Sequence, residues 1–590
     1  MHSTPLPRLP ILEAIAKHDP DSRAVIHSAS GRAFTYGQLL GDVRKARDRF
    51  YEACGKSDLA GQRIALLVEN SYDYVVTLLA AIAARSVAVP MSPAFPDPEL
   101  QYILNHSEAS LLVTSPKFAA KARQVLSTEL AARPTYLEMP KHLGRGKIEQ
   151  ASLEVSDPAG AGLMLYTSGT TNRPKGVLIP QSTLTAQSHS LIEAWNYTPA
   201  DHLLHVLPLH HIHGTVNALI APLFAGSCIE FMFPFNADAV WKRLAAPFVS
   251  SRDPRSVNVA DGTPGVDGVH GSGANGSESC RPKVSFFTVV PTVYSRLLAS
   301  HKSLPAALQQ AAREAVSPQN LRLNISGSAA LPTPVKSAWQ TLSRGNVLLE
   351  RYGMTEVGMA LSCGLDFRDR VDGSVGWPLP SVQARLVDLD SGQVIRPGEE
   401  VDANGRERSG EIQLRGPTIF QEYWRDPAAT AKEFVADPDN QGRWFKTGDV
   451  AVRRAVPSAS RSQPWTRGPL YFIQGRLAAD IIKTGGEKVS ALEVERELLS
   501  LPDVSEAAVV PVPSGNWGQK VGAVLILSPD AVHKWSPLGM RRALKTRLAH
   551  YKIPQVFKIV DHIPRNAMGK INKKQLAKEI FADECSGDEA

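Results

Sequence analysis

The sequence predicts an α/β protein with a large N-terminal domain of doubly wound sheets and a small C-terminal α/β domain. Two observations support this prediction. A chain of 590 residues is too long to fold around a single hydrophobic core. Between residues 60 and 115, short apolar runs alternate with stretches of helical apolar spacing. This alternation of strand, helix and strand is typical of a parallel sheet with helices on both faces.

The individual elements follow from these apolar patterns. The sequence predicts a helix over residues 72–84. Another helix should begin at Asp97, whose carboxylate would cap it, with Pro98 in the first helical position. Residues 251–282 are rich in Gly, Ser, Asp and Pro and lack aromatic residues, so we expect a disordered surface insertion there. The predicted strands are 64–68, 87–89, 111–113, 203–207 and 284–290.

A change of pattern marks the second domain. From about residue 475 the sequence predicts a helix over 491–500, strands over 507–512 and 521–527, and a basic helix over 540–548. About 110 residues are enough for a separate small domain. The predicted domains are therefore 1–475 and 476–590.

Composition excludes several classes of protein. The formal charge of +7 is mild for this length, comes without a long Lys/Arg run and suits anionic small molecules as well as nucleic acid, so it decides little. We expect small-molecule substrates and no nucleic-acid partner. Five dispersed cysteines with no C-x-x-C pair argue against a disulfide scaffold and a zinc site. The longest apolar stretch, 75–84, is too short to span a bilayer, so no membrane insertion is expected. Without a secretory signal, a convincing presequence or a peroxisomal tripeptide, we expect a cytoplasmic location, with mitochondria as the alternative. The oligomeric state stays open.

One polar loop, Tyr166 to Gly176, lies between two apolar runs. It reads Tyr-Thr-Ser-Gly-Thr-Thr-Asn-Arg-Pro-Lys-Gly. Glycines let the backbone turn its N–H groups inward, and hydroxyls add donors, as in loops that bind phosphate. A Walker A loop does not fit, because Lys175 is followed by glycine rather than by a hydroxyl residue. The alternative is a mobile Ser/Thr/Gly surface turn.

A second polar motif, Tyr352-Gly-Met-Thr355-Glu356, also suits a nucleotide. The aromatic ring can stack on adenine, and the Thr355 hydroxyl can bind an α-phosphate oxygen. Glu356 offers the carboxylate oxygen that Mg²⁺ prefers. Taken alone, the Thr-Glu pair could equally be a solvated helix start.

Together these two motifs resemble the signatures of the adenylate-forming superfamily, which includes acyl-CoA synthetases, peptide-synthetase adenylation domains and luciferases. The resemblance implies an ATP site with Mg²⁺ held by Thr170 and Glu356, and coenzyme A as a co-substrate. Thr355 and Glu356 would act in catalysis. The nucleotide-binding residues of the first loop would be Thr167, Ser168, Gly169, Thr170, Thr171, Arg173 and Lys175.

Further segments resemble family motifs in the same order. Ser328 lies in a Ser-Gly-Ser-Ala-Ala turn that would line the adenylate and acyl pocket. Asp449 would accept hydrogen bonds from the ribose hydroxyls, and Arg476 would contact the ribose or phosphate region. Lys570, in Pro-Arg-Asn-Ala-Met-Gly-Lys, would reach the α-phosphate during adenylation, where negative charge develops. His211 matches a gating residue beside the acyl carboxylate.

The linker between the predicted domains departs from the usual spelling. Relatives commonly read G-R-x-K-D, whereas this chain reads Gly-Arg-Leu-Ala-Ala-Asp480, one residue longer and without the lysine. Asp480 is the predicted hinge of a mobile small domain. Gly485 and Gly486 would form the hairpin that closes on the pantetheine arm of coenzyme A in the second half-reaction.

Two arginines indicate which acid is activated. Arg351 directly precedes the Tyr-Gly-Met-Thr-Glu motif, and Arg296 lies on a predicted helix that lines the acyl pocket in the family. Two guanidinium groups in one pocket would require a second carboxylate on the substrate. The alternative is that both are surface or structural arginines. With the His-rich segment 207–214, they make the chain similar to malonyl-CoA synthetases, including the eukaryotic mitochondrial member.

The sequence therefore predicts ATP-dependent activation of malonate to malonyl-AMP, followed by transfer to coenzyme A. Methylmalonate is a candidate second substrate, because one methyl group changes binding by only about 1–3 kcal/mol. Two alternatives share this chemistry: a short- or medium-chain acyl-CoA synthetase, and an adenylating enzyme that loads a carrier protein. A catalytically silent nucleotide-binding or scaffold protein is the alternative from another class.

Overall fold

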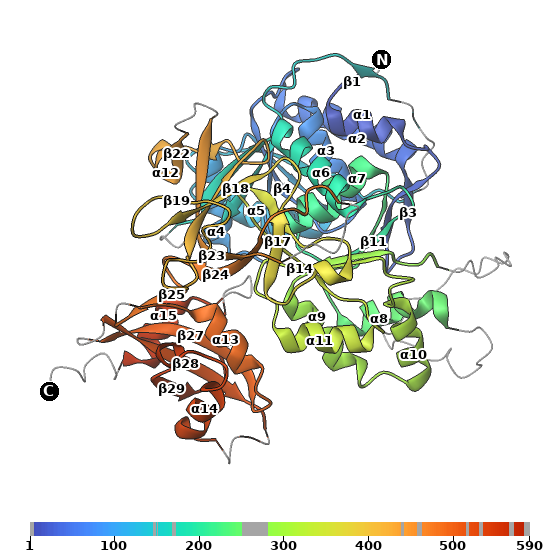
Figure 1. Ribbon diagram of the computed structural model, residues 1–590. Coiled ribbons are helices and arrows are strands. Elements are labelled where there is room, and N and C mark those ends of the chain that lie inside the picture. Colours follow the sequence, from blue (N-terminus) through green and yellow to red (C-terminus); the bar gives the residue numbers. More distant parts are fainter. Residues whose placement is uncertain are drawn as a thin grey trace.

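The structure is a computed structural model of the 590-residue chain. Figure 1 shows a large body, coloured blue to yellow, with an orange-red C-terminal part at its lower left. The structure describes residues 5–144, 149, 151–167, 173–249, 281–437, 442–456, 463–485, 487–514, 518–529, 531, 535–565 and 571–582.

The first sheet of the large body confirms the predicted parallel arrangement. Its inner strands pair in parallel, while the edge strands β10 and β21 run antiparallel. The described strands follow the order β21 (Glu422–Tyr423), β10 (Lys175–Pro180), β9 (Gly162–Thr167), β5 (Val87–Pro90), β4 (Arg63–Leu67), β6 (Leu111–Thr114) and β7 (Thr135–Glu138).

The second sheet is larger and changes from parallel to antiparallel at β15. β22 (Phe434–Ala436) pairs with β23 beside the main path, and β1 (Leu6–Pro7) pairs with β8 (Leu153–Glu154) elsewhere. The main path runs β19 (Val394–Ile395), β18 (Gln383–Asp388), β20 (Gly410–Arg415), β23 (Arg443–Arg454), β24 (Leu470–Arg476), β17 (Ser374–Pro378), β16 (Gly358–Ser362), β15 (Leu349–Met354), β14 (Leu323–Gly327), β13 (Phe286–Val289), β11 (His202–His205), β12 (Cys228–Phe231), β2 (Arg23–His27) and β3 (Ala33–Thr35).

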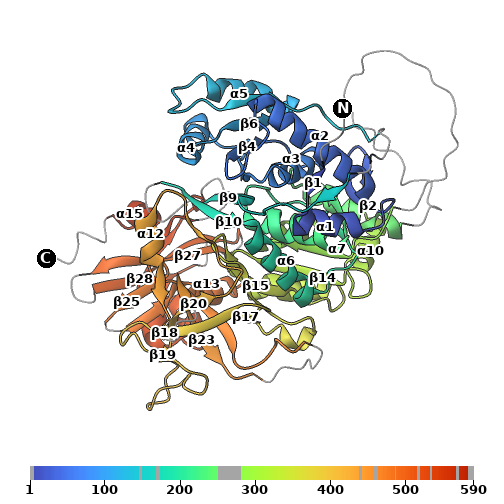
Figure 2. The ribbon, with the colours of Figure 1, turned by 90° about the horizontal axis from the view of Figure 1, so that it is seen from above.

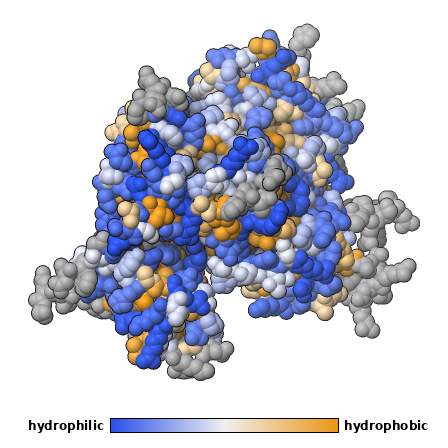
Figure 3. All heavy atoms as spheres, in the orientation of Figure 1, coloured by the Kyte–Doolittle hydropathy of each residue, from blue (hydrophilic) through white to orange (hydrophobic). Residues whose placement is uncertain are grey.

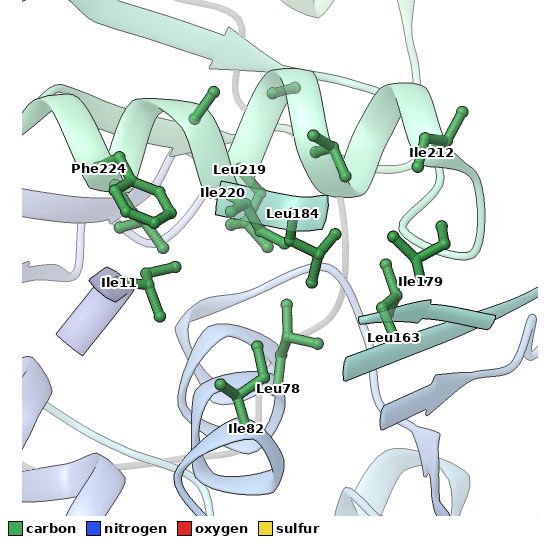
Figure 4. Close-up of a cluster of buried hydrophobic side chains, with 14 of the residues drawn as sticks. Ile11, Leu78, Ile82, Leu163, Ile179, Leu184, Ile212, Leu219, Ile220 and Phe224 are labelled. Carbon is green, nitrogen blue, oxygen red and sulfur yellow. The ribbon is translucent and has the colours of Figure 1, made fainter. Parts of the chain in front are cut away.

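One group of helices lies between the two sheets, and α3 (Tyr72–Ala83) is at its centre. Every residue of α3 is buried, because the helix is apolar on all sides rather than along one stripe. Figure 4 shows Leu78 and Ile82 of this helix pointing toward Leu184, Leu219 and Ile220. The other helices of the group are α1 (Pro10–Lys17), α2 (Tyr36–Cys54), α6 (Gln181–Trp195), the π-helix η2 (His213–Ile220) and α7 (Ala221–Ala225).

Another group of helices covers the opposite face of the large sheet, as Figure 1 shows below β11 and β14. These are α8 (Ala237–Ala245), α9 (Pro291–His301), α10 (Ala306–Ala315) and α11 (Thr333–Leu342), and they pack on one another around a separate hydrophobic cluster. The remaining helices of the large body are α4 (Asp97–Ser107), α5 (Ala119–Leu126) and α12 (Pro427–Glu433).

The predicted cap of α4 is wrong in detail. The residue before the helix is Pro96, and Asp97 is already the first helical residue, with no side chain capping the helix. The Asp97 carboxylate accepts a hydrogen bond of 2.6 Å from the Gln124 amide on α5 instead. A carboxylate in the first turn still interacts favourably with the helix dipole, so the helix begins close to the predicted position.

The C-terminal part has a sheet and a core of its own, and Figure 2 shows its elements to one side of the large body. Its helices are α13 (Ala491–Leu499), α14 (Pro537–Leu544) and α15 (Lys573–Ile580). The predicted helix over 540–548 begins earlier, because Ser536 caps it and Pro537 follows. The strands run in the order β26 (Glu487–Ser490), β25 (Ile481–Thr484), β28 (Gly518–Leu527), β27 (Val504–Ser514), with β29 (Val556–Ile559) paired to β28.

Two predictions about organisation stay predictions. The domain boundary at 475/476 is one, and the disorder of 251–282 is the other, since residues 250–280 lie outside the described part of the chain.

Figure 3 shows apolar residues scattered among hydrophilic ones over the visible face. Within the described residues, no helix combines the length and apolar character needed to cross a membrane.

A buried ion pair stabilises the parallel half of the large sheet. Glu230 on β12 contacts Nε2 of His202 at 2.7 Å and Nη2 of Arg243 at 2.7 Å. Burial alone would raise the pKa of the Glu230 carboxyl, but the hydrogen bonds from His202 and Arg243 lower it to about 2. The folded state therefore prefers the ionised carboxylate.

We predict that Glu230→Gln destabilises the protein at pH 7 by about 3 kcal/mol, the energy of a pKa shift of about 2.5 units. The native pKa lies below the unfolded one, so this stability is present above about pH 4.5 and is lost as the pH falls toward 2. Urea unfolding at pH 7, 5.5 and 4 checks the prediction.

The difference between parent and variant should shrink at the lowest pH. Glu13→Gln, which removes an exposed partner of Lys17, is the matched control and should change stability by less than about 0.5 kcal/mol. Equal stability of Glu230→Gln and parent at pH 7 would contradict the prediction.

Candidate active site

The predicted phosphate loop joins two strands that form a hairpin. β9 and β10 pair antiparallel, with Thr167 opposite Lys175. The hairpin therefore fixes both ends of the loop at the edge of the first sheet. Ser168, Gly169, Thr170 and Thr171, including the proposed metal ligand Thr170, lie outside the described residues. Arg173 is described, and its guanidinium lies over the ring of Tyr102 at 5.8 Å.

The hairpin meets the second motif through a tyrosine that the sequence did not indicate. The ammonium group of Lys175 lies 4.6 Å from the ring centroid of Tyr423 on β21. The Tyr423 hydroxyl donates a hydrogen bond of 3.0 Å to the Glu356 carboxylate. The Glu356 carbonyl oxygen accepts a hydrogen bond from the Phe420 amide at 2.7 Å. Lys175 and Glu356, which are 181 positions apart in the sequence, therefore share one neighbour.

Glu356 and Thr355 lie in the turn after β15. Burial raises the pKa of the Glu356 carboxyl, and hydrogen bonds, including that from Tyr423, oppose the rise. Among the described residues no group of three His, Cys, Asp or Glu side chains could hold a metal.

A second cluster of polar contacts joins three strands of the large sheet. The Tyr352 hydroxyl on β15 donates a hydrogen bond of 2.6 Å to the carboxylate of Asp449 on β23. Arg476, at the end of β24, lies directly opposite Asp449 in the strand register, and its Nε is 3.3 Å from the same carboxylate. Burial raises the pKa of the Tyr352 phenol, and the Asp449 carboxylate raises it further. The predicted adenine, ribose and phosphate contacts are thus direct neighbours.

Arg351 is the most unusual group of the site. Its side chain is 2% exposed, and its guanidinium lies against Gly327, where an added Cβ would come within 2.5 Å of Cζ. Nη2 donates a hydrogen bond of 3.2 Å to Oγ of Ser328. Nε and Nη1 have no hydrogen-bond partner among the described residues. Burial lowers the pKa of the guanidinium to about 9, so Arg351 is still cationic at pH 7.

Ser328 connects Arg351 to a buried histidine. Ser328 follows β14 and adopts a positive φ of 68°, which turns the chain at the end of the strand. Its Oγ lies 3.5 Å from Nδ1 of His213, and Nε2 of His213 lies 2.7 Å from Oγ1 of Thr288. Burial lowers the pKa of His213 well below its usual value, and the nearby charge of Arg351 adds to the effect. His213 is therefore neutral and adds no second cation.

His211, in contrast, is half-buried, and its ring lies 4.1 Å from that of His210. His210 in turn contacts Phe95 at 5.1 Å between ring centroids. Burial and the neighbouring His211 lower the pKa of His210 to about 3. The sequence singled out His211 from the His-rich run and did not single out His213, the member that reaches Ser328.

Arg296 does not share the environment of Arg351. It lies on α9 as predicted, but its side chain is exposed and its guanidinium stacks on Phe235, 5.0 Å from the ring centroid. Helical spacing placed Arg296 on α9 but did not show which face of the helix carries it. The predicted pair of arginines therefore consists of one buried and one exposed cation, and no contact among the described residues joins them.

The predicted hinge lies between β24 of the large sheet and β25 of the C-terminal sheet, and the predicted hairpin belongs to the C-terminal sheet. Asp480 directly precedes β25, and its carboxylate accepts a hydrogen bond of 3.0 Å from the backbone N–H of Arg476. Gly485 forms the exposed turn between β25 and β26 with a positive φ of 56°. Gly486 and Lys570 lie outside the described residues.

Comparison with known proteins assigns this chain to a family. The sequence matches the AMP-binding enzyme family over residues 12–247 and 279–424, and the AMP-binding enzyme C-terminal domain over residues 493–570. A CoA ligase of Gibberella moniliformis is 54% identical over 98% of this chain and 96% of its own length. The mitochondrial malonate–CoA ligase of Homo sapiens is 36% identical over 92% of this chain and 88% of its own length.

Solved structures show the same relationship. The ATP-bound MatB from Rhodopseudomonas palustris superposes with a TM-score of 0.74 at 29% identity, covering 98% of this chain and 100% of that chain. The family matches cover most of the chain. The phosphate-loop hairpin and Tyr352 lie within the first match, and Asp449 and Arg476 lie between the two matches. This chain therefore belongs to the AMP-binding enzymes of the adenylate-forming superfamily, close to the malonate–CoA ligases.

Proposed function

We propose that the protein is an AMP-forming ligase that joins malonate to coenzyme A. The observation that carries the choice of acid is the buried guanidinium of Arg351, which has two donor nitrogens without partners among the described residues. A buried cation without a counter-charge is unfavourable, so the pocket favours an anionic ligand group. The relatives named malonate–CoA ligases support the same choice.

The substrate acid needs two carboxylates, one that is adenylated and one that pairs with the Arg351 guanidinium. Adenylation converts one carboxylate into a mixed anhydride and removes its charge. The second carboxylate stays anionic and can accept hydrogen bonds from Nε and Nη1 of Arg351 in both half-reactions. Arg351 contacts Ser328, which is expected to line the adenylate and acyl pocket, so a short diacid would reach from the guanidinium to the adenylate.

The first half-reaction is displacement at phosphorus. One carboxylate oxygen of malonate attacks the α-phosphorus of ATP, the bond to the bridging oxygen breaks, and pyrophosphate leaves. Tyr352, Asp449 and Arg476, the nucleotide cluster, would hold the nucleoside. Lys175 and Glu356, which share Tyr423 as a neighbour, would face the phosphates. Mg²⁺, when bound, neutralises phosphate charge, and Glu356 is the described carboxylate that would hold it.

The second half-reaction is acyl transfer. The thiol sulfur of coenzyme A attacks the acyl carbon of malonyl-AMP, the carbon–oxygen bond to AMP breaks, and AMP leaves as the thiol loses its proton. We propose that the small domain rotates at Asp480 between the two steps, which withdraws Lys570 and presents the hairpin of Gly485 and Gly486. Such rotation lets one pocket serve two transition states with different charges.

We expect a panel of acids, scored by AMP release in the presence of coenzyme A, to rank malonate first and methylmalonate next. Acetate and octanoate should each be at least 100-fold less efficient in kcat/KM, because they leave Arg351 unpaired. A preference for octanoate would support the medium-chain alternative. AMP release that depends on a carrier protein and not on coenzyme A would support the carrier-loading alternative.

We predict that Arg351→Leu lowers kcat/KM for malonate by about 100-fold, corresponding to the loss of charged hydrogen bonds worth about 3 kcal/mol. The KM for ATP should change by less than about threefold, because the nucleotide cluster keeps its contacts. Steady-state kinetics with both substrates measure the effect.

Arg296→Ala is the comparison variant, since it removes the exposed arginine of the predicted pair. We propose that Arg296 is a second, weaker contact for the acid, so its loss should lower kcat/KM for malonate by less than about tenfold, as expected for a solvent-screened charge. Malonate kinetics in Arg351→Leu that match the parent would refute the dicarboxylate assignment.

We predict that Lys570→Ala abolishes measurable adenylation while it leaves the conversion of supplied malonyl-AMP to malonyl-CoA within about threefold of the parent. The reason is that a lysine at the α-phosphate stabilises the transition state of phosphoryl displacement, whereas the proposed rotation withdraws it before acyl transfer. Malonate-dependent exchange of pyrophosphate into ATP measures the first step. Parent-like exchange by the variant would exclude Lys570 from the mechanism.

A further inference from the structure

A buried lysine joins the predicted hinge to the C-terminal domain. Lys573 is the first residue of α15, and its side chain is 10% exposed. Its Nζ lies 2.5 Å from the Asp480 carboxylate and 2.7 Å from that of Glu495 on α13. Both carboxylates are also largely buried, at 14% exposure. None of the proposed chemical steps uses Lys573 or Glu495.

The Asp480 carboxylate has a different partner on each of its two oxygens. Oδ1 accepts from Lys573, and Oδ2 accepts a hydrogen bond of 3.0 Å from the backbone N–H of Arg476. Arg476 ends β24 of the large sheet and is paired through its side chain with Asp449 of the nucleotide cluster. One carboxylate therefore connects the large sheet with a helix of the small domain.

The small-domain side of this contact is rigid. Glu495 not only pairs with Lys573 but also accepts a hydrogen bond of 2.7 Å from the backbone N–H of Val509 on β27. Lys573 is therefore fixed between a strand-anchored carboxylate and the hinge. A buried cation between two carboxylates is favourable only while all partners stay in place, because removal of one leaves a buried charge uncompensated.

Rotation at Asp480 would disturb this arrangement directly. Arg476 and Lys573 lie on opposite sides of Asp480 in the chain, and one belongs to each body. A change of the backbone dihedrals at Asp480 moves one partner relative to the other, so a single carboxylate cannot keep both contacts at these distances. By contrast, Lys488 contacts Asp390 across the same boundary through a carboxylate that is 81% exposed, and such a pair contributes little.

We propose that Asp480, Lys573 and Glu495 form a latch that holds the small domain in the arrangement of this structure, and that Lys573 is a positioning residue for the two half-reactions. The inference rests on the proposed two-step function. Lys573 follows Lys570 by three residues in the sequence. Loss of the latch therefore removes a contact close in sequence to the adenylation lysine. The rate of adenylation should fall more than the rate of thioester formation.

The test compares three variants of the full-length protein: Lys573→Met, Lys573→Arg and Glu495→Gln. The measurements are malonate-dependent pyrophosphate exchange, conversion of supplied malonyl-AMP to malonyl-CoA, and the thermal midpoint. In Lys573→Met we expect exchange to fall at least tenfold and transfer from malonyl-AMP to change by less than threefold. Lys573→Arg, which keeps the cation, should return the ratio of the two rates to within about twofold of the parent. Glu495→Gln leaves the Asp480–Lys573 contact in place and should change the ratio less than Lys573→Met does.

Two outcomes overturn the proposal. A parent-like ratio in Lys573→Met shows that the contact does not influence the half-reactions. An equal fall of both rates with a lowered thermal midpoint shows a structural brace and no positioning role. If Lys573→Met does not fold, the near-isosteric Asp480→Asn carries the test and must shift the same ratio at least fivefold.

The proposed function is tested separately, because it fails when no acid supports exchange in the parent protein. The latch fails when the parent is active and the ratio does not respond. A double variant, Asp480→Asn with Lys573→Met, distinguishes a direct pair from independent effects. We expect its ratio to equal that of Lys573→Met alone, and additive shifts would contradict a shared latch.

Discussion

The guanidinium of Arg351, two of whose nitrogens have no hydrogen-bond partner in the described part of the chain, lies where β14 ends beside β15. β14 and β15 are adjacent and in register, so the turn after one strand and the last residues of the other meet at a single edge. Arg351 is held there between Gly327 and Ser328 and is closed off from water. The positive charge of this group would favour an anionic ligand beside it, and the neutral His213 next to Ser328 does not balance that charge.

The remaining site is organised by contacts between elements that are far apart in the sequence. Tyr423 links the hairpin of the phosphate loop to Glu356, and Asp449 links Tyr352 to Arg476. From Arg476 the contacts continue through Asp480 to Lys573. The nucleotide cluster and the small domain are therefore connected by a continuous series of polar contacts, and each contact carries a charged group that would be unfavourable without its partner.

Local sequence patterns predicted the helices and strands and several residues of the site. They could not predict the contacts between residues that are far apart in the chain. Apolar periodicity located β4, α3 and β5 to within one residue, because burial on a sheet or between layers fixes that periodicity. Motif spelling indicated Asp449 and Arg476, which proved to be direct neighbours. Tyr423 and Glu495 carry no local signal, since their importance comes from partners that are at least 14 positions away in the chain. The exposure of Arg296 depends on the rotation of α9 against its neighbours, which spacing alone does not determine.

The glycine beneath the guanidinium offers a route by which related enzymes could diverge. Position 327 has no side chain, and the planar head of Arg351 occupies the space that one would fill. A single extra methyl group there would push the cation away from Ser328 while the arginine itself stayed unchanged. Acceptance of a different acid could therefore evolve at a residue that has no side chain of its own, and a comparison restricted to the charged positions would overlook it.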